Sequence, residues 1–205
     1  GTPNLLLAGL RYKLGLRIRP PYTLQDMAQD ALGVLDALGV ARAHIVGVSM
    51  GGMIAQRVAI AAPQRAISLT SIMSSSGAKG LKQAHPDVTR ILISRPVSPA
   101  LEAVVDHYVK LYRAIGSPDF PTPEPELRER IARGVQRSYH PAGVRRQMLA
   151  ILADITRAAQ LSRITSPTLV LHGRADPLVP FEHGEDVTRR IAGARLVGID
   201  GMGHD

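Results

Sequence analysis

Apolar residues recur with two different periods along the chain, and these periods predict an alternation of helices and strands. Between residues 24 and 38 the apolar positions lie three or four apart, after a capping-box-like start at Thr23 and Asp26, which predicts an amphipathic helix. Short apolar runs bounded by turn residues predict strands instead. The expected helices are 24–38, 50–62, 99–115, 125–138, 141–153 and 181–191, and the expected strands are 44–48, 66–73, 168–171 and 195–199.

The order of these elements predicts an α/β fold. Strands separated by helices require crossover connections, so we expect a parallel sheet flanked by helices. Residues 74–165 differ, because proline-rich breaks such as GSPDFPTPEPE separate their helices and no strand pattern interrupts them. We therefore expect a core formed by residues 1–73 and 166–205, with a helical cap at 74–165 inserted between two strands.

Composition excludes several classes of protein. The chain has 205 residues and no cysteine, which rules out disulfides, thiolate nucleophiles and Cys-based zinc sites. The net charge of +8 is spread along helical segments, and two phenylalanines without any tryptophan offer little for base stacking, so we expect no nucleic-acid binding. No apolar run is long enough to cross a bilayer. The chain begins with Gly1 rather than Met, so targeting cannot be read from it. We expect a cytoplasmic protein and leave export open.

One serine stands between glycines where a predicted strand becomes a predicted helix. The stretch Gly47-Val48-Ser49-Met50-Gly51 fits the G-x-S-x-G pattern of a nucleophile elbow, a strained turn on which flanking side chains would collide. We expect the glycines to permit this turn and Ser49 to be the nucleophile. The backbone N–H of Met50, at the helix N-terminus, would then point toward an oxyanion. The alternative is a glycine-rich turn with an inert hydroxyl.

A serine nucleophile needs a base to remove its proton and an acid to orient that base. VLHGRADPLVP places Asp176 in the loop after the third strand, and LVGIDGMGHD places His204 in the loop after the fourth. Because parallel strands end at one edge of a sheet, we expect these side chains to meet Ser49 there. Of the other histidines, His172 ends a strand and is expected to be packed and hydrogen-bonded. No HExxH-like spacing supports a metal site.

The stretches VGVSMGGMIAQ, LVLHGRADPLVP and GMGHD together resemble the α/β-hydrolase superfamily. They are most similar to the capped serine esterases that include polyketide methylesterases and enol-lactonases. The likeness extends from YTLQDMAQDALGVLDALG to the last residue. It implies that Ser49, Asp176 and His204 are nucleophile, acid and base. It also implies a cap over the pocket, a small-molecule ester or lactone as substrate, and no cofactor.

The sequence departs from this family at both ends. Family members have strands ahead of the pre-elbow helix, one of which leads into a His-Gly loop that donates a second oxyanion N–H, and a helix beyond the catalytic histidine. Here the only His-Gly is His172-Gly173, in the acid-bearing segment. We therefore expect a fragment of a longer hydrolase, with the elbow strand left as an exposed edge able to pair with a second copy. Loss of one oxyanion donor costs roughly 3 to 4 kcal/mol in the barrier.

These observations favour a serine hydrolase that cleaves a carboxylic ester or lactone through an acyl-enzyme. A perhydrolase, an aminopeptidase or an acyltransferase would use the same three residues, so these activities stay open. A non-catalytic binding protein of the same fold is the alternative from a different class. Nothing in the sequence identifies the substrate.

Overall fold

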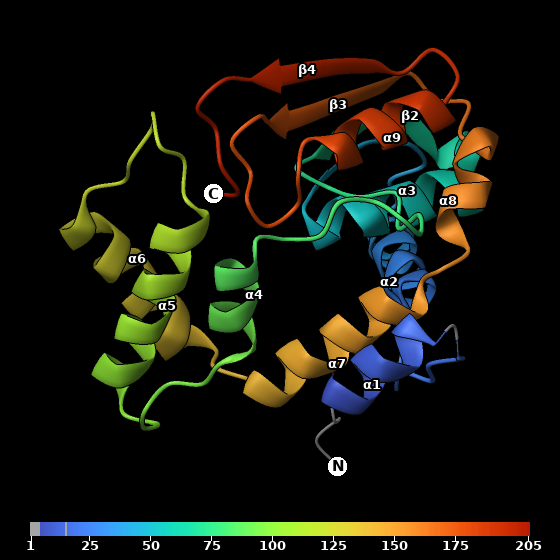
Figure 1. Cartoon of the computed structure of the whole chain (residues 1–205). Coiled ribbons are helices and arrows are strands. Elements are labelled where there is room, and N and C mark those ends of the chain that lie inside the picture. Colours follow the sequence, from blue (N-terminus) through green and yellow to red (C-terminus); the bar gives the residue numbers. More distant parts are fainter. Residues whose placement is uncertain (1–4, 15) are drawn as a thin grey trace. The chain divides into compact units, whose positions relative to one another are not determined.

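The computed structural model describes residues 5–14 and 16–205, and helices separate its successive strands along the chain (Figure 1). Each predicted helix and strand occurs, with ends within two residues of those expected. The longer elements are α1 (Leu5–Lys13), α2 (Leu24–Ala37), β1 (Ala43–Val48), α3 (Met50–Ala61), β2 (Ala66–Ile72), α4 (Pro86–Ile93), α5 (Leu101–Ile115), α6 (Glu124–Arg137), α7 (Pro141–Ala153), β3 (Thr168–Gly173), α9 (Glu182–Arg190) and β4 (Arg195–Ile199). Short helical turns lie at Pro63–Arg65, Arg157–Gln160 (α8) and Leu161–Arg163.

The four strands among the described residues form one sheet in the order β1-β2-β3-β4. Strand β1 pairs with β2 in parallel, with Val48 opposite Ile72, and β2 pairs with β3 in parallel, with Ile72 opposite Leu171. The predicted α/β fold with a parallel sheet is therefore confirmed. Strand β1 lies at the edge of the sheet, as expected, and its Val46 and Val48 side chains are 62% and 51% exposed. Pairing of this edge with a second copy stays a prediction.

The chain divides into two compact units. Unit 1 comprises Gly1–Leu81, Pro141–Leu171 and Glu182–Val197, and unit 2 comprises Lys82–His140, His172–Phe181 and Gly198–Asp205. The division crosses β3 and β4 near their carboxyl ends. Helix α7, which the sequence assigns to the cap, belongs to unit 1. The predicted separation of cap and core stays a prediction.

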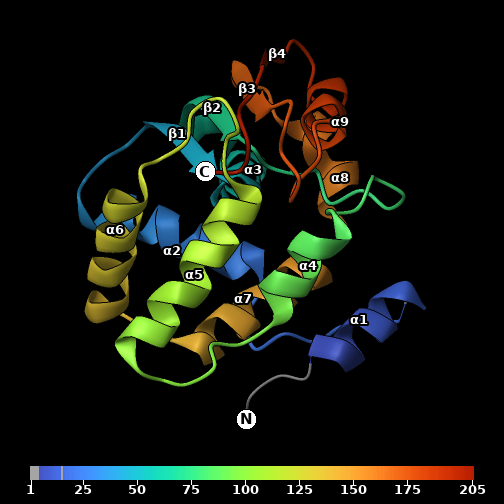
Figure 2. The same cartoon turned by 60° about the vertical axis from the view of Figure 1, so that its left-hand side comes forward.

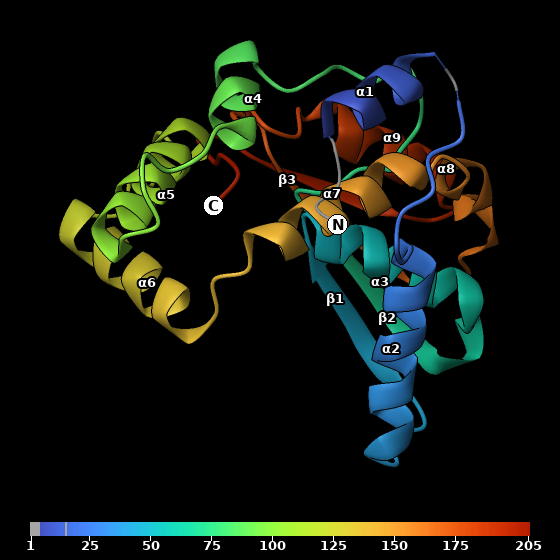
Figure 3. The same ribbon diagram turned by 90° about the horizontal axis from the view of Figure 1, so that it is seen from below.

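Unit 1 is built around the helix that follows the elbow. Helix α3 lies against β1 and β2, and α2 packs on α3 (Figure 3). Small residues of α3, Ala55 and Ala59, join Leu69 of β2 and Val187 of α9 in one buried cluster. A capping box fixes the first turn of α2. The Thr23 N–H donates to the Asp26 carboxylate (2.8 Å), and the Asp26 N–H donates to Thr23 Oγ1 (3.1 Å).

Unit 2 contains α4, α5 and α6 together with the loops that follow β3 and β4. Helices α5 and α6 lie side by side (Figure 2) and bury Val105, Val109, Leu127 and Ile131 between them. Among the described residues, no helix is both long enough and apolar enough to span a membrane.

Candidate active site

Ser49 occupies a strained turn between β1 and α3. Its backbone has φ 52° and ψ −119°, a conformation that non-glycine residues rarely adopt and that costs about 1 to 3 kcal/mol. The Ser49 N–H donates to the Ile72 carbonyl of β2 (2.9 Å). Its own carbonyl accepts the first helical hydrogen bonds, from the N–H groups of Gly52 (3.0 Å) and Met53 (3.3 Å). The half-buried serine therefore stands where the strand becomes the helix.

The need for glycine around Ser49 differs from the expectation. A Cβ on Gly47 would lie 2.1 Å from the Gly51 carbonyl oxygen, so this position requires glycine. A Cβ on Gly51, in contrast, would meet nothing within 4 Å. The second crowded position is Gly52, whose Cβ would lie 2.6 Å from Ser74 Cβ. The expectation of collisions at both motif glycines is thus wrong at Gly51. The backbone of Gly51 lies close to Gly47, but the position of its own Cβ is open.

Asp176 and His204 form a buried hydrogen-bonded pair in unit 2. His204 Nδ1 lies 2.6 Å from Asp176 Oδ2, and the two side chains are 7% and 0% exposed. The other carboxylate oxygen, Oδ1, accepts the backbone N–H groups of Leu178 (2.9 Å) and Val179 (2.8 Å). Because both oxygens are engaged, the carboxylate is held in one orientation toward the imidazole ring.

The segment at the end of α5 holds the histidine loop. The His204 N–H donates to the Ile115 carbonyl (2.7 Å), and the Gly203 N–H donates to Ser117 Oγ (2.9 Å). Asp205 Oδ1 in turn accepts the N–H (2.9 Å) and the hydroxyl (2.5 Å) of Ser117. A Cβ on Gly203 would lie 2.5 Å from the Gly116 backbone, so only glycine allows this approach. Sequence reasoning missed these supports, which have no local signature.

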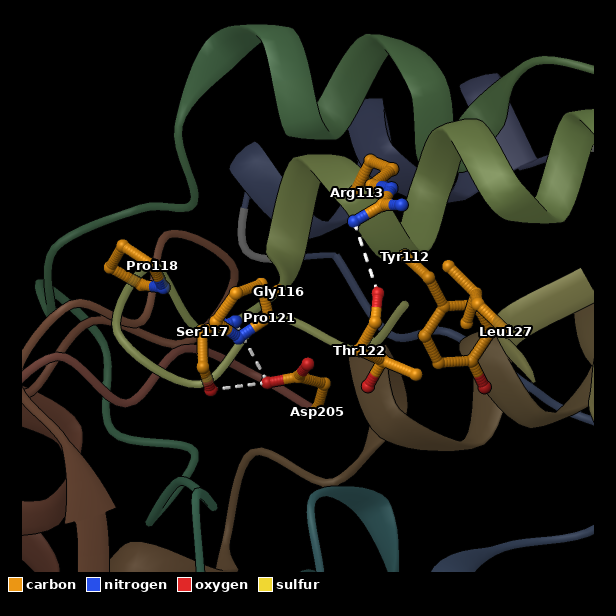
Figure 4. Close-up of a pocket in the computed structure, with 9 residues that line it drawn as sticks. All are labelled: Tyr112, Arg113, Gly116, Ser117, Pro118, Pro121, Thr122, Leu127 and Asp205. Atoms are coloured by element: carbon orange, nitrogen blue, oxygen red, sulfur yellow. Dashed lines mark hydrogen bonds between the residues drawn. The ribbon is translucent and has the colours of Figure 1, made fainter. Parts of the chain in front are cut away.

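A pocket of about 250 Å³ lies beside this segment (Figure 4). Figure 4 shows the Asp205 carboxylate against Ser117 on one side of the pocket and Tyr112 and Leu127 on the other. The Asp205 carboxylate therefore bonds to Ser117, two residues beyond the end of α5.

His172 is fully buried, and its Nε2 lies 2.7 Å from the Val179 carbonyl and 3.7 Å from Asp176 Oδ2. Its expected packed and hydrogen-bonded role is confirmed. The ring also contacts Phe181 edge to face, with centroids 5.9 Å apart. His172 thus supports the loop that carries the acid.

The predicted site residues fall in both units. Asp176 and His204 are together in unit 2, whereas Ser49 and Met50 belong to unit 1. The meeting of Ser49 with the pair, and the direction of the Met50 N–H, stay predictions. Within the part of the chain that the structure describes, no three His, Asp or Glu side chains are grouped as a metal site requires.

Comparison with known proteins found similar chains among hydrolases. The family model for the alpha/beta hydrolase fold matches residues 14–205. Rhodomycin D methylesterase DauP of Streptomyces sp. (strain C5) is 30% identical, over 95% of this chain and 70% of its own length. The 3-oxoadipate enol-lactonase 2 of Acinetobacter baylyi is 26% identical, over 86% of this chain and 62% of its own length.

Among solved structures, a hydrolase from Pseudomonas aeruginosa PA01 is similar, with a TM-score of 0.61 and 29% identity. That alignment covers 90% of this chain and 66% of the solved chain. The chain therefore spans about two thirds of the length of the relatives that it matches.

Proposed function

Because this chain belongs to the α/β-hydrolase fold family, we propose that it is a serine hydrolase that cleaves a small carboxylic ester or lactone through an acyl-enzyme. The observation that carries this proposal is the buried hydrogen bond between Asp176 and His204. A carboxylate bound to Nδ1 fixes the neutral tautomer in which Nε2 is the proton acceptor. The methylesterase and enol-lactonase relatives support a carbonyl ester as the substrate class.

In this proposal Ser49 is the nucleophile. As Ser49 Oγ attacks the ester carbonyl carbon, His204 Nε2 takes the hydroxyl proton and Asp176 stabilises the imidazolium that forms. The carbonyl oxygen becomes an oxyanion that accepts the Met50 N–H at the start of α3. The imidazolium then protonates the leaving alkoxide, and the acyl group stays on Ser49.

Water completes the reaction by the same steps in reverse. His204 Nε2 removes a proton from the water, whose oxygen attacks the acyl carbon, and the proton passes to Ser49 Oγ as the carboxylic acid leaves. An acceptor other than water at this stage would make the protein an acyltransferase. The serine at position 49 excludes the alkyl-enzyme chemistry that requires a carboxylate nucleophile.

A fluorophosphonate probe tests the proposal, because it reacts covalently only with an activated serine. We expect mass spectrometry to find one adduct, on Ser49, and Ser49→Ala to abolish it. Ser138→Ala, an exposed serine at the end of α6, is the matched control and should label normally. Ser74 is unsuitable as a control, because its hydroxyl bonds to the Ser49 carbonyl.

Asp176→Asn should lower the rate of short-chain aryl ester hydrolysis by about four orders of magnitude, because an amide favours the wrong histidine tautomer. A panel of methyl esters, aryl esters and lactones would then define the substrate. The proposal is refuted if the wild-type chain takes up no probe and hydrolyses none of these compounds, or if the adduct persists in Ser49→Ala.

A further inference from the structure

Two strained residues lie next to each other at the carboxyl ends of β1 and β2. Among the described residues, Ser49 (φ 52°) and Met73 (φ 40°) are the non-glycine residues with positive φ. They follow Val48 and Ile72, which are paired across the two strands. Such conformations persist only where the surrounding structure holds them.

The side chain that reaches the elbow is that of Ser74. Its hydroxyl donates to the Ser49 carbonyl oxygen at 2.7 Å, in addition to the helical N–H groups of Gly52 and Met53. Ser74 is 1% exposed, so its hydroxyl has no access to bulk water. The close approach of Gly52, whose Cβ would lie 2.7 Å from Ser74 Oγ, leaves no space for water between them. The left-handed turn at Met73 directs the chain so that Ser74 lies over the elbow.

The residues after Ser74 are fastened in unit 1 by buried charges. Arg157, which is 1% exposed, donates to the Ser75 carbonyl and is paired with Asp154 (2.6 Å). The hydroxyl of Ser76 donates to Asp186 at 2.6 Å. These contacts come from α8 and α9, elements distant in sequence from the elbow. The Ser74–Ser76 segment is therefore a fixed support rather than a loose loop.

We propose that Ser74 is a positioning residue that holds the nucleophile elbow through the Ser49 carbonyl. This inference rests on the proposed function. A hydroxyl that is buried and bonded to the backbone acts through Ser49 and does not contact a substrate. Loss of this bond allows the elbow to relax from its strained φ, and small displacements of a nucleophile reduce the rate of attack. The effect falls on kcat, while substrate binding, and hence KM, is unchanged.

The test compares Ser74→Ala with Ser71→Ala. Both variants lose one buried serine hydroxyl, but the Ser71 hydroxyl accepts a hydrogen bond from Gln56 Nε2 (3.2 Å), whereas the Ser74 hydroxyl donates to the Ser49 carbonyl. From the net strength of one hydrogen bond, we expect Ser74→Ala to slow fluorophosphonate labelling and kcat between about twofold and tenfold, with KM unchanged. Ser71→Ala should react at the wild-type rate. Equal rates for Ser74→Ala and wild type, or an equal loss in Ser71→Ala, would overturn the inference.

A second measurement does not depend on catalysis. The amides of Gly52 and Met53 donate to the same Ser49 carbonyl, so their hydrogen exchange reports on the elbow. We expect faster exchange of both amides in Ser74→Ala than in Ser71→Ala. If the wild type takes no probe, the proposed function fails and this comparison alone decides the role of Ser74: unchanged exchange refutes it. If the wild type is labelled at Ser49, the labelling rate and the hydrogen exchange of Ser74→Ala test the role of Ser74 separately from the proposed function.

Discussion

Alanine at Gly47 and at Gly51 gives the sharpest contrast that the elbow geometry predicts. A methyl group on Gly47 would lie 2.1 Å from the Gly51 oxygen, 2.4 Å from its carbonyl carbon and 2.6 Å from the Gly52 nitrogen. All three are backbone atoms, so no side chain can rotate away and the start of α3 must move. Over-packing typically costs about 1 to 3 kcal/mol, and a collision with backbone places Gly47→Ala near 3 kcal/mol or above.

Gly51→Ala is the matched control, because it adds the same methyl group to the same motif. The new Cβ meets nothing within 4 Å and the residue lies within α3 with negative φ, so we expect a gain of about 0.5 to 1 kcal/mol from helix propensity. The two variants should therefore differ by roughly 4 kcal/mol in the free energy of unfolding.

Urea unfolding followed by circular dichroism measures this difference. With a slope of about 2 kcal/mol per molar urea, the midpoints of the two variants should lie about 2 M apart. The labelling experiment gives a second readout, in which Gly51→Ala keeps the Ser49 adduct and Gly47→Ala loses it. Equal stability of Gly47→Ala and wild type would show that Gly47 does not lie as close to the Gly51 backbone as described. An equal loss of stability in Gly51→Ala would refute the inference that Gly47, unlike Gly51, lacks room for a methyl group.

Three further predictions concern the support of unit 1. Asp154→Asn should destabilise the fold by about 3 to 5 kcal/mol, because the Asp154 carboxylate pairs with buried Arg57 and Arg157. The control is Arg133→Gln, which breaks the exposed ion pair with Glu129 and should change the free energy of unfolding in urea by less than about 0.5 kcal/mol. Burial alone would raise the pKa of Asp186, but hydrogen bonds from Arg190, Ser76 and Arg189 bring that pKa below its usual 3.8. A pKa that is lower in the folded state stabilises the fold above about pH 4, and this stabilisation is lost as the pH falls. Asp186→Asn should therefore flatten the acid side of a plot of urea midpoint against pH. An unchanged acid side would contradict this. Thr23→Ala should cost about 1 kcal/mol in thermal or urea unfolding, since it removes the N-cap of α2, whereas Thr23→Ser should retain most of that stability.

Much of the fold was predictable because its signals are local. The capping box of α2, the strand-to-helix change around Ser49 and the crossover order of the strands each lie within a short stretch of chain, and all occur in the structure. The assignment to the α/β-hydrolase family is likewise confirmed. Helices α1 and α4 were not predicted. The N-cap of helix α4 is His85, whose ring accepts the Asp87 N–H, and His is an uncommon N-cap.

The sequence by itself determined which residues could carry chemistry: a serine on a glycine-flanked turn and an acid and a histidine on loops after strands. Only the tertiary structure decided what surrounds them. Asp176 meets His204 across 28 positions, Ser117 meets Asp205 across 88, and Arg57 meets Asp154 across 97. Periodicity and turn propensity act over a few residues, whereas these contacts arise from packing between distant elements, which no short stretch of sequence encodes. For this reason the sequence alone could indicate Ser49 as the candidate nucleophile, whereas the hydrogen bond from Ser74 to its carbonyl came only from the fold.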